Sequence, residues 1–178
     1  MIVKAIILTL AISFTAMVAA QSNDRLSLGA EAAHPLGSFG QQFGFGYGAT
    51  LGVEVIAATH FSLIAQAGFI RFSGINSQIG SFQFPALNTI PVQVGGRYYF
   101  RDDHLGMYLG AMGGAHFTMV EGGDTENHII AAPLIGLMLT PNFDLTFRYQ
   151  MFYDTYEENG NQRINTEGYL ALRAAYVL

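Results

Sequence analysis

The sequence predicts an all-β fold, a single barrel of eight antiparallel up-and-down strands, and three observations lead to this prediction. First, 51% of the 178 residues are apolar and only 12% are charged, which is unusual for a water-soluble domain. Second, beyond residue 20 no uninterrupted apolar run reaches the ~20 residues that a membrane-spanning helix needs. Third, apolar and polar residues alternate over long segments, which is the period of a β-strand with two different faces. An apolar chain without membrane helices points to the other structure that a bilayer accepts, a closed transmembrane barrel.

Eight segments carry this alternation, and most of them are long enough to cross a bilayer. A tilted strand needs ~9–11 residues to do so, whereas a strand of an ordinary globular protein has ~5–6. We therefore predict transmembrane strands at residues 25–33, 43–56, 61–72, 89–100, 106–118, 128–139, 144–154 and 168–178.

The connections between these segments alternate in length. Long connections are predicted at residues 34–42, 73–88, 120–127 and 155–167, and short ones at residues 57–60, 101–105 and 140–143. An even number of strands with long loops at one end and tight turns at the other is the layout of outer-membrane barrels. This layout places both ends of the barrel domain on the tight-turn side.

The N-terminal residues have the three parts of a secretory signal peptide. Lys4 lies in a short charged start, residues 5–18 form an apolar run, and Ala19-Ala20 provide a small-residue exit. We predict a signal peptide at residues 1–20, cleaved after Ala20, and one outer-membrane barrel domain at residues 21–178. In that domain thirteen acidic residues outnumber the seven arginines by six, which excludes a basic surface for nucleic acid. The chain has no cysteine, which excludes disulfides and thiolate metal sites.

The two faces of the predicted strands differ in the size and polarity of their side chains. In the segment 43–56, bulky residues such as Phe45 and Leu51 alternate with glycines, Thr50 and Glu54. A closed eight-stranded barrel has interior room only for side chains or one small ligand. The small and polar face is therefore predicted to line the interior, and the bulky face to contact lipid. The segment 128–139 is apolar on both faces, so its orientation stays open.

Carrying this alternation around the barrel predicts a polar network in the interior. A charge in a low-dielectric interior is costly unless it is paired, so we expect the charged members to meet. Such a network would stabilise the barrel and block a straight water path. Its predicted members are Glu31, Glu54, Gln66, Gln93, Arg97, His116, Arg148, Gln150 and Arg173, with Tyr108 on the same face.

Aromatic residues of the lipid-facing set gather toward both ends of the predicted strands. Two aromatic belts at the membrane boundaries are expected of transmembrane barrels. The predicted belts are Phe43, Phe45, Phe69, Phe117, Tyr149 and Tyr153 toward the loops, and Phe61, Tyr98, Phe100 and Tyr176 toward the turns.

Taken together, these features resemble the small outer-membrane β-barrel family typified by OmpX and the membrane domain of OmpA. The resemblance covers nearly all of residues 21–178 and rests on the Ala-Ala-Gln signal exit, the eight alternating strands, the glycine-rich interior positions and the last strand. It implies a monomer in the bacterial outer membrane with both termini in the periplasm. It also implies contact with outer-membrane lipids and lipopolysaccharide, and insertion by the barrel-assembly machinery. Members usually end in an aromatic residue that this machinery reads, whereas this chain ends in Leu178 with Tyr176 two residues before it.

Catalytic, cofactor and metal sites are not predicted. His116 and Thr118 share a face and are similar to the His-x-Ser pair of lipid A deacylases, but no acidic residue is fixed beside them. His60 and His104 lie in tight turns without a second ligand at metal spacing. The acidic residues of the loops lack the spacing of a calcium-binding loop; they are Glu121, Asp124, Glu126, Glu157, Glu158 and Glu167.

Four functional hypotheses follow. The favoured one is a non-enzymatic outer-membrane barrel with a polar, plugged lumen and a structural or surface-interaction role through its extracellular loops, whose partner stays open. The alternatives are a narrow pore for small solutes, a lipid-modifying outer-membrane enzyme, and a soluble ligand-binding barrel of the lipocalin type.

Overall fold

The computed structural model of the protein describes residues 24–75, 85–120, 125–158 and 161–178, without the side chains of residues 154–165. The predicted signal peptide, residues 1–20, lies outside these ranges. Eight strands and one short helix make up the structure. They are β1 (Asp24–Leu36), α2 (Phe39–Gln42), β2 (Phe43–Ala58), β3 (Phe61–Gly74), β4 (Leu87–Tyr99), β5 (Gly106–Val120), β6 (Thr125–Thr140), β7 (Phe143–Glu158) and β8 (Asn161–Val177).

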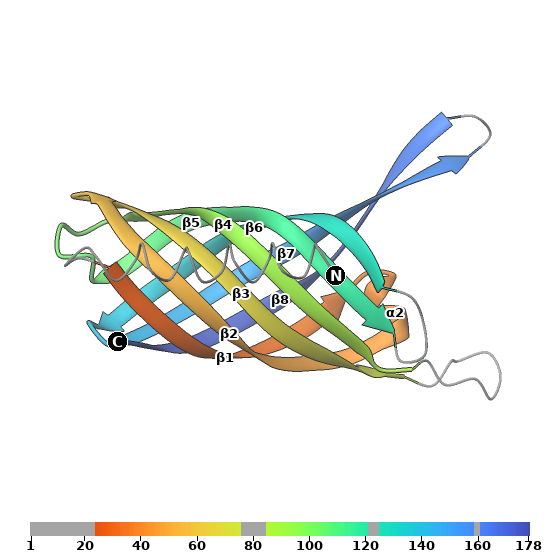
Figure 1. Ribbon diagram of the computed structural model, residues 1–178, viewed down its shortest axis with the longest axis horizontal. Coiled ribbons are helices and arrows are strands. Elements are labelled where there is room, and N and C mark those ends of the chain that lie inside the picture. Colours follow the sequence, from red (N-terminus) through yellow and green to blue (C-terminus); the bar gives the residue numbers. More distant parts are fainter. Residues whose placement is uncertain (1–23, 76–84, 121–124, 159–160) are drawn as a thin grey trace, which may run out of the picture.

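The strands form one closed barrel in which each strand pairs antiparallel with its neighbours in the chain (Figure 1). The barrel closes where β1 pairs with β8, from Ser27 opposite Val177 to Leu36 opposite Gly168. Within the barrel wall, closure gives each described strand a hydrogen-bonded neighbour on both sides, so the wall has no edge strand. The predicted all-β fold of eight up-and-down strands is therefore confirmed.

The two ends of the barrel differ, and we call them the turn end and the loop end. Short connections join β2 to β3, β4 to β5 and β6 to β7 at the turn end, while α2 lies at the loop end (Figure 1). The last strand finishes at the turn end, because Val177 N donates to Asn142 O at 2.9 Å and Leu178 N donates to Leu26 O at 2.8 Å. The start of β1 and the end of β8 thus share the turn end, as the alternating loop lengths predict.

The turn between β4 and β5 is organised by one carboxylate. Arg101 donates to Asp103 through Nε at 3.1 Å and through Nη2 at 2.6 Å, and the Leu105 backbone N–H donates to Asp103 at 3.0 Å. These donors hold the pKa of the Asp103 carboxyl below its usual range, with the Arg101 hydrogen bond as the main cause. His104 and Gly106 complete the turn in the left-handed region, with φ of 55° and 81°.

Two of the four expected long loops consist largely of regular structure. The expected loop at residues 34–42 holds the end of β1 and the four-residue helix α2. The expected loop at residues 155–167 is largely a continuation of β7 and β8, paired from Thr155 opposite Ile164 to Glu158 opposite Asn161. Cross-strand pairing extends this hairpin beyond the barrel wall, and polar composition alone could not reveal that pairing.

No helix within the described ranges is long and apolar enough to span a membrane.

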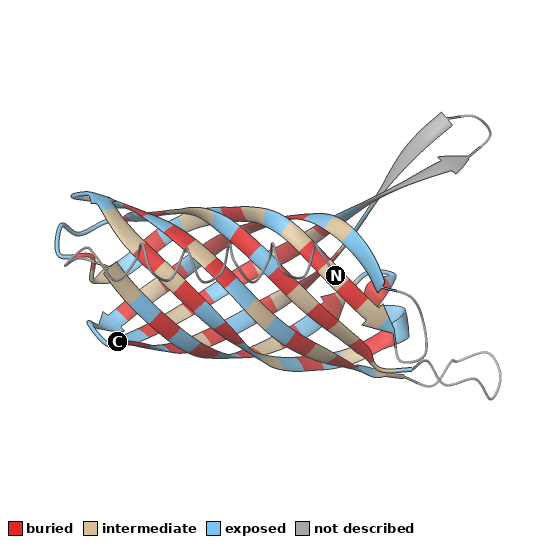
Figure 2. Ribbon diagram, viewed as in Figure 1, coloured by how far each residue is buried: buried red, intermediate tan, exposed pale blue. Residues whose placement is uncertain are grey.

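Buried and more exposed residues alternate along most of the described length of the strands, as the colours in Figure 2 show. Thr50 is only 2% exposed while its neighbour Leu51 is 57% exposed, in the directions the sequence predicts. The orientation of β6, which the sequence left open, is now fixed. Ile130 and Leu134 are buried in the interior, whereas Ile129 and Ile135 lie on the outer wall.

Phe43 is an exception to the predicted outer face. The sequence predicts Phe43 in the aromatic belt near the loops, but its side chain is buried against Phe39 of α2, with ring centroids 5.0 Å apart. The pairing of β2 with β3 shifts between Phe43 and Gly46, so that the strict alternation is broken there. Such an irregularity redirects a side chain to the opposite face. The other nine predicted belt residues point outward.

Candidate functional site

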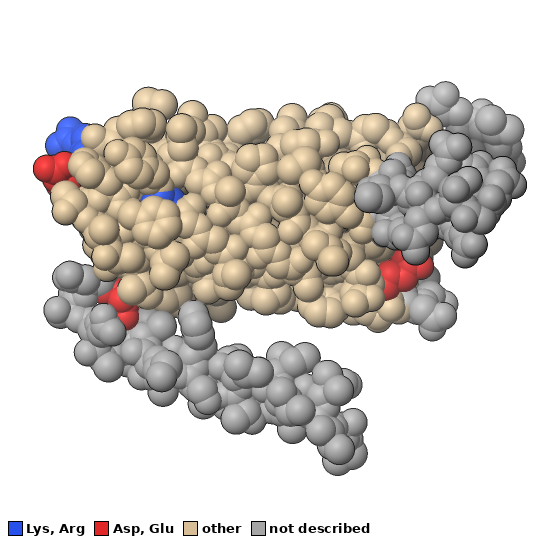
Figure 3. Space-filling view, turned by 90° about the horizontal axis from the view of Figure 1, so that it is seen from above, with Lys and Arg blue, Asp and Glu red and all other residues tan. Residues whose placement is uncertain are grey.

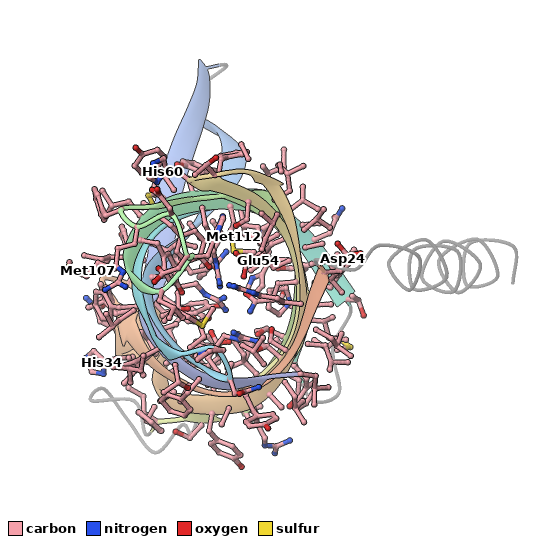
Figure 4. The ribbon with its side chains drawn as sticks, turned by 90° about the vertical axis from the view of Figure 1, so that its left-hand side faces the viewer. Asp24, His34, Glu54, His60, Met107 and Met112 are labelled. Carbon is pink, nitrogen blue, oxygen red and sulfur yellow. The ribbon has the colours of Figure 1, made fainter. Side chains whose placement is uncertain are left out.

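The barrel interior contains all nine residues of the predicted polar network. Each of them is at most 6% exposed. Figure 4, which views the barrel from the turn end, shows Glu54 and Met112 inside the ring of strands, while Met107 and His34 lie outside it. The interior side chains form three layers, which are described below from the turn end to the loop end.

Asp144 lies at the centre of the first layer, near the turn end. Its Oδ2 accepts hydrogen bonds from Arg97 Nη2 at 3.2 Å, from Arg173 Nη1 at 3.4 Å and from the Thr146 hydroxyl at 3.1 Å. Its Oδ1 accepts a hydrogen bond from the Tyr108 hydroxyl at 2.6 Å. Donors from four strands therefore converge on one buried carboxylate, which is how a charge is made tolerable in a low-dielectric interior.

Glu54 provides the second carboxylate of this layer. Arg97 donates through Nη1 to Oε2 at 3.2 Å, and the hydroxyls of Tyr99, at 2.7 Å, and Ser62 donate to Oε1. The Arg97 guanidinium also lies over the Tyr108 ring, 4.5 Å from its centroid, which adds a cation–π contact. We call this layer the lower cluster; its members are Glu54, Ser62, Arg97, Tyr99, Tyr108, Asp144, Thr146 and Arg173.

Two glycines give these large side chains their room. A Cβ on Gly136 would collide with the Tyr108 ring, and a Cβ on Gly29 would lie 2.7 Å from Arg173 Nε. Arg173 Nε can therefore reach the Thr50 hydroxyl at 2.6 Å. The glycine-rich interior face that the sequence shows thus makes space for the arginines and tyrosines opposite it.

The second layer crosses the middle of the barrel. Arg148 of β7 donates through Nη1 to Gln66 Oε1 of β3 at 2.5 Å and through Nη2 to Glu31 of β1. Gln150 of β7 accepts a hydrogen bond at 2.6 Å from Gln93 of β4. Since β3 and β7 lie on opposite sides of an eight-stranded barrel, these hydrogen bonds span its interior. We call this layer the central bridge.

The structure corrects the prediction of one connected network. The hydrogen bonds that the predicted residues make fall into two separate groups, the lower cluster and the central bridge. Glu31 and Glu54 do not lie near each other, because Glu31 pairs with Gly48 and Glu54 with Arg25, six residues apart along β2. That separation amounts to about 20 Å along a strand. Arg173 lies opposite Glu31 in the backbone register, but its guanidinium turns to Asp144 and Ser27.

Asp144 is the functional residue that the sequence prediction missed. It lies on the same face as Thr146, Arg148 and Gln150, but it stands at the start of its strand, beside a turn. The predicted network held two acidic residues and three arginines, which left one positive charge without a partner. With Asp144 the described interior holds three buried carboxylates and three buried guanidinium groups, so the charges balance.

His116 does not belong to the polar network, contrary to prediction. Its ring stacks on Phe152 with centroids 5.3 Å apart, and neither of its ring nitrogens has a hydrogen-bond partner. Phe152 belongs to a third, aromatic layer at the loop end, in which Phe39 of α2 also contacts Phe72, at 5.2 Å. We call this layer the aromatic cap; its members are Phe39, Phe43, Phe72, Phe152 and Tyr169.

The arrangement around Thr118 lacks the order of a catalytic triad. Thr118 Oγ1 lies 3.3 Å from His128 Nε2, and Glu126 Oε2 lies 3.8 Å from the same nitrogen. A nucleophile–base–acid set needs the acid on the other ring nitrogen. His116, the base suggested by the sequence, makes no hydrogen bond to Thr118 or Glu126 through its ring nitrogens. The described residues also contain no group of three metal-ligating side chains.

Comparison with known proteins gives structural matches only. No protein-family model and no curated protein matches the sequence. The attachment invasion locus protein Ail of Yersinia pestis is similar in structure, with a TM-score of 0.55 and 12% identity over 89% of this chain and 100% of that one. Ail has also been crystallised with the heparin analogue sucrose octasulfate.

Two Pseudomonas aeruginosa proteins are also similar. The outer membrane protein OprG matches with a TM-score of 0.55 and 8% identity over 89% of this chain and 97% of that one. The N-terminal β-barrel domain of OprF matches with a TM-score of 0.51 and 10% identity over 89% of this chain and 100% of that one. These similarities show that the chain has the fold of the small eight-stranded outer-membrane barrels.

Proposed function

We propose, from the premise that this chain has the fold of the small outer-membrane barrels, that it is a monomeric, non-enzymatic protein of the bacterial outer membrane. Its turn end, with both ends of the barrel domain, faces the periplasm, and its loop end faces the outside. Its role is structural or lies in surface interaction through the loops. The lumen network serves as a plug that closes the barrel to solutes.

The layered interior is the observation that carries this proposal. The lower cluster joins side chains from β2, β3, β4, β5, β7 and β8, and the central bridge joins opposite walls. The aromatic cap adds an apolar layer above them. Three successive layers of buried side chains leave little room for a continuous water path, which argues against a pore.

The outer wall supports the membrane location. Bulky apolar residues are exposed along the wall, with Ile129 at 74%, Val94 at 63% and Leu51 at 57%. On the face of the barrel that Figure 3 shows, the charged residues lie toward the two ends, and the wall visible between them is almost entirely uncharged. A water-soluble barrel of the lipocalin type would have the opposite distribution, since a continuous apolar surface of this size is costly in water.

The charge of the loop end argues for a partner that is not a polyanion. The connections at residues 120–127 and 155–167 hold six acidic residues and one arginine. An acidic surface repels sulfated sugars such as the heparin analogue found with Ail. A basic or neutral partner fits this end better.

We expect the protein to fractionate with the outer membrane and to stay there through washing with high salt. Its electrophoretic mobility in detergent should change on heating, because a closed barrel resists unfolding until it is boiled. Recovery in the soluble periplasmic fraction would contradict the outer-membrane location and favour the hypothesis of a soluble ligand-binding barrel of the lipocalin type.

In planar bilayers, the purified protein should show little steady conductance. Arg148→Ala removes the side chain that bridges β1, β3 and β7, so this variant is expected to show more frequent openings. Arg101→Ala at the exposed turn is the matched control and should behave as the wild type does. Large, steady channels in the wild-type protein would contradict the plug and support the narrow pore.

A further inference from the structure

At the loop end, a pocket opens beside the aromatic cap, and neither the plug nor the membrane wall accounts for it. It is formed between α2, the first residue of β2 and strands β4 to β8, and its volume is about 190 Å³. A cavity of about 150 Å³ accommodates one benzene molecule. The mouth pocket, as we call it, therefore has room for a body of about one aromatic ring with two or three further atoms.

The inner side of the mouth pocket is apolar and largely aromatic. Phe39, Phe43 and Phe152 of the aromatic cap line it together with Leu87, and each of these side chains is at most 9% exposed. Such a lining suits an apolar ligand body, because burial of that body removes its surface from water.

The rim of the mouth pocket is acidic. Glu126 and Glu167 both line it, and none of the ten lining residues is a lysine or an arginine. The Glu126 side chain is 75% exposed, and Glu167 accepts a hydrogen bond from the Ser38 hydroxyl at 2.7 Å. His128, Thr118 and Gln42 complete the polar part of the lining.

We propose that the mouth pocket binds small primary amines with an apolar body the size of one aromatic ring. The carboxylates of Glu126 and Glu167 pair with the ammonium group, and the phenylalanines enclose the body. The two carboxylates favour a cation and disfavour an anion of the same shape. The proposal extends the surface-interaction role, because it gives the loop end a ligand class.

The test uses the isotope-labelled full barrel domain in phosphatidylcholine nanodiscs at pH 8, where histidine is neutral and an alkylamine is charged. The probes are 2-phenylethylamine, its neutral analogue 2-phenylethanol, and the anion phenylacetate. We expect the amine to shift the NMR signals of Phe39, Leu87 and Phe152 and to bind at least tenfold more tightly than the alcohol. Phenylacetate should bind least.

Two variants and one control locate the binding. The double variant Glu126→Gln Glu167→Gln should lower the affinity for the amine about tenfold and leave that for the alcohol unchanged. Phe152→Leu should weaken both. Asp102→Asn, an exposed carboxylate at the turn end, is the control and should change neither.

The proposal fails if amine and alcohol bind equally, if the glutamine variant keeps full affinity, or if the shifts fall on outer-wall residues such as Leu28 and Val94. The last pattern would mean partition into the lipid. Because nanodiscs expose both ends of the barrel, these outcomes do not depend on the membrane orientation. Failure of the amine-binding proposal can therefore be distinguished from failure of the outer-membrane location or of the plug, which are tested by fractionation and by conductance.

Discussion

Asp144→Ala should destabilise the protein more than any substitution in a turn. Its removal leaves Arg97 with Glu54 as its remaining carboxylate partner, and leaves the Arg173 guanidinium hydrogen-bonded to the hydroxyls of Ser27 and Thr50 in place of a carboxylate. Breaking a buried ion pair by removing one partner costs about 3–5 kcal/mol, because the other charge stays buried. The free energy of unfolding, measured by urea titration in lipid vesicles with gel mobility as the readout, should fall by this amount.

Asp102→Ala is the matched control for this prediction. Asp102 carries the same charge, but its side chain is 80% exposed at the turn end, where it pairs with His60 at 3.2 Å. Its removal should cost less than about 1 kcal/mol, as is usual for exposed pairs. Equal losses for Asp144→Ala and Asp102→Ala would show that the interior charges are not energetically paired.

A second variant separates loss of charge balance from loss of packing. Replacing Asp144 and Arg173 together by methionine removes one negative and one positive charge and retains apolar volume. The double variant should therefore be more stable than Asp144→Ala alone, because no unpaired guanidinium remains beside Arg97. If the stability loss of the double variant equals the sum of the losses of the single variants Asp144→Met and Arg173→Met, direct coupling between Asp144 and Arg173 is absent.

Leu51→Arg is expected to have the next largest effect, through the bilayer rather than the interior. Leu51 lies near the middle of β2 on the outer wall, and its register partners Leu28 and Ala67 are also exposed there. An arginine on the lipid-facing side at the bilayer midplane costs about 2–4 kcal/mol, and the cost falls to about 0–1 kcal/mol near the interface. Urea unfolding in vesicles measures this difference.

Met107→Arg is the depth control, because Met107 is exposed on the outer wall beside the turn that precedes β5 (Figure 4). The loss of stability caused by Met107→Arg should stay near the interfacial value of about 0–1 kcal/mol. Thr50→Arg, one residue from Leu51, places a further guanidinium beside Arg173 and should destabilise the barrel equally in vesicles and in detergent micelles. If Leu51→Arg were harmless and lipid-reactive probes labelled residue 50, the interior and outer faces would have to be exchanged.

Much of the fold followed from the order of residues along single strands. The period of two, the length of the segments and the alternation of long and short connections predicted eight strands and their order. The same alternation assigned Glu54, Arg97 and Arg173 to the interior, because a side chain on a strand has only two faces to choose from. The single-strand pattern failed for β6, where both faces are apolar, and at Phe43, where the pairing with β3 shifts.

The sequence by itself determined which residues face inward, whereas only the tertiary structure decided which of them meet. Contacts across the lumen depend on the stagger between strands when the barrel closes, and that stagger is a property of all eight strands together. It separates Glu31 from Glu54, brings Arg173 to Asp144, and places His116 on Phe152. The mouth pocket has the same origin, since its lining comes from residues 39 to 167 and exists only once α2 and the strand ends are brought together.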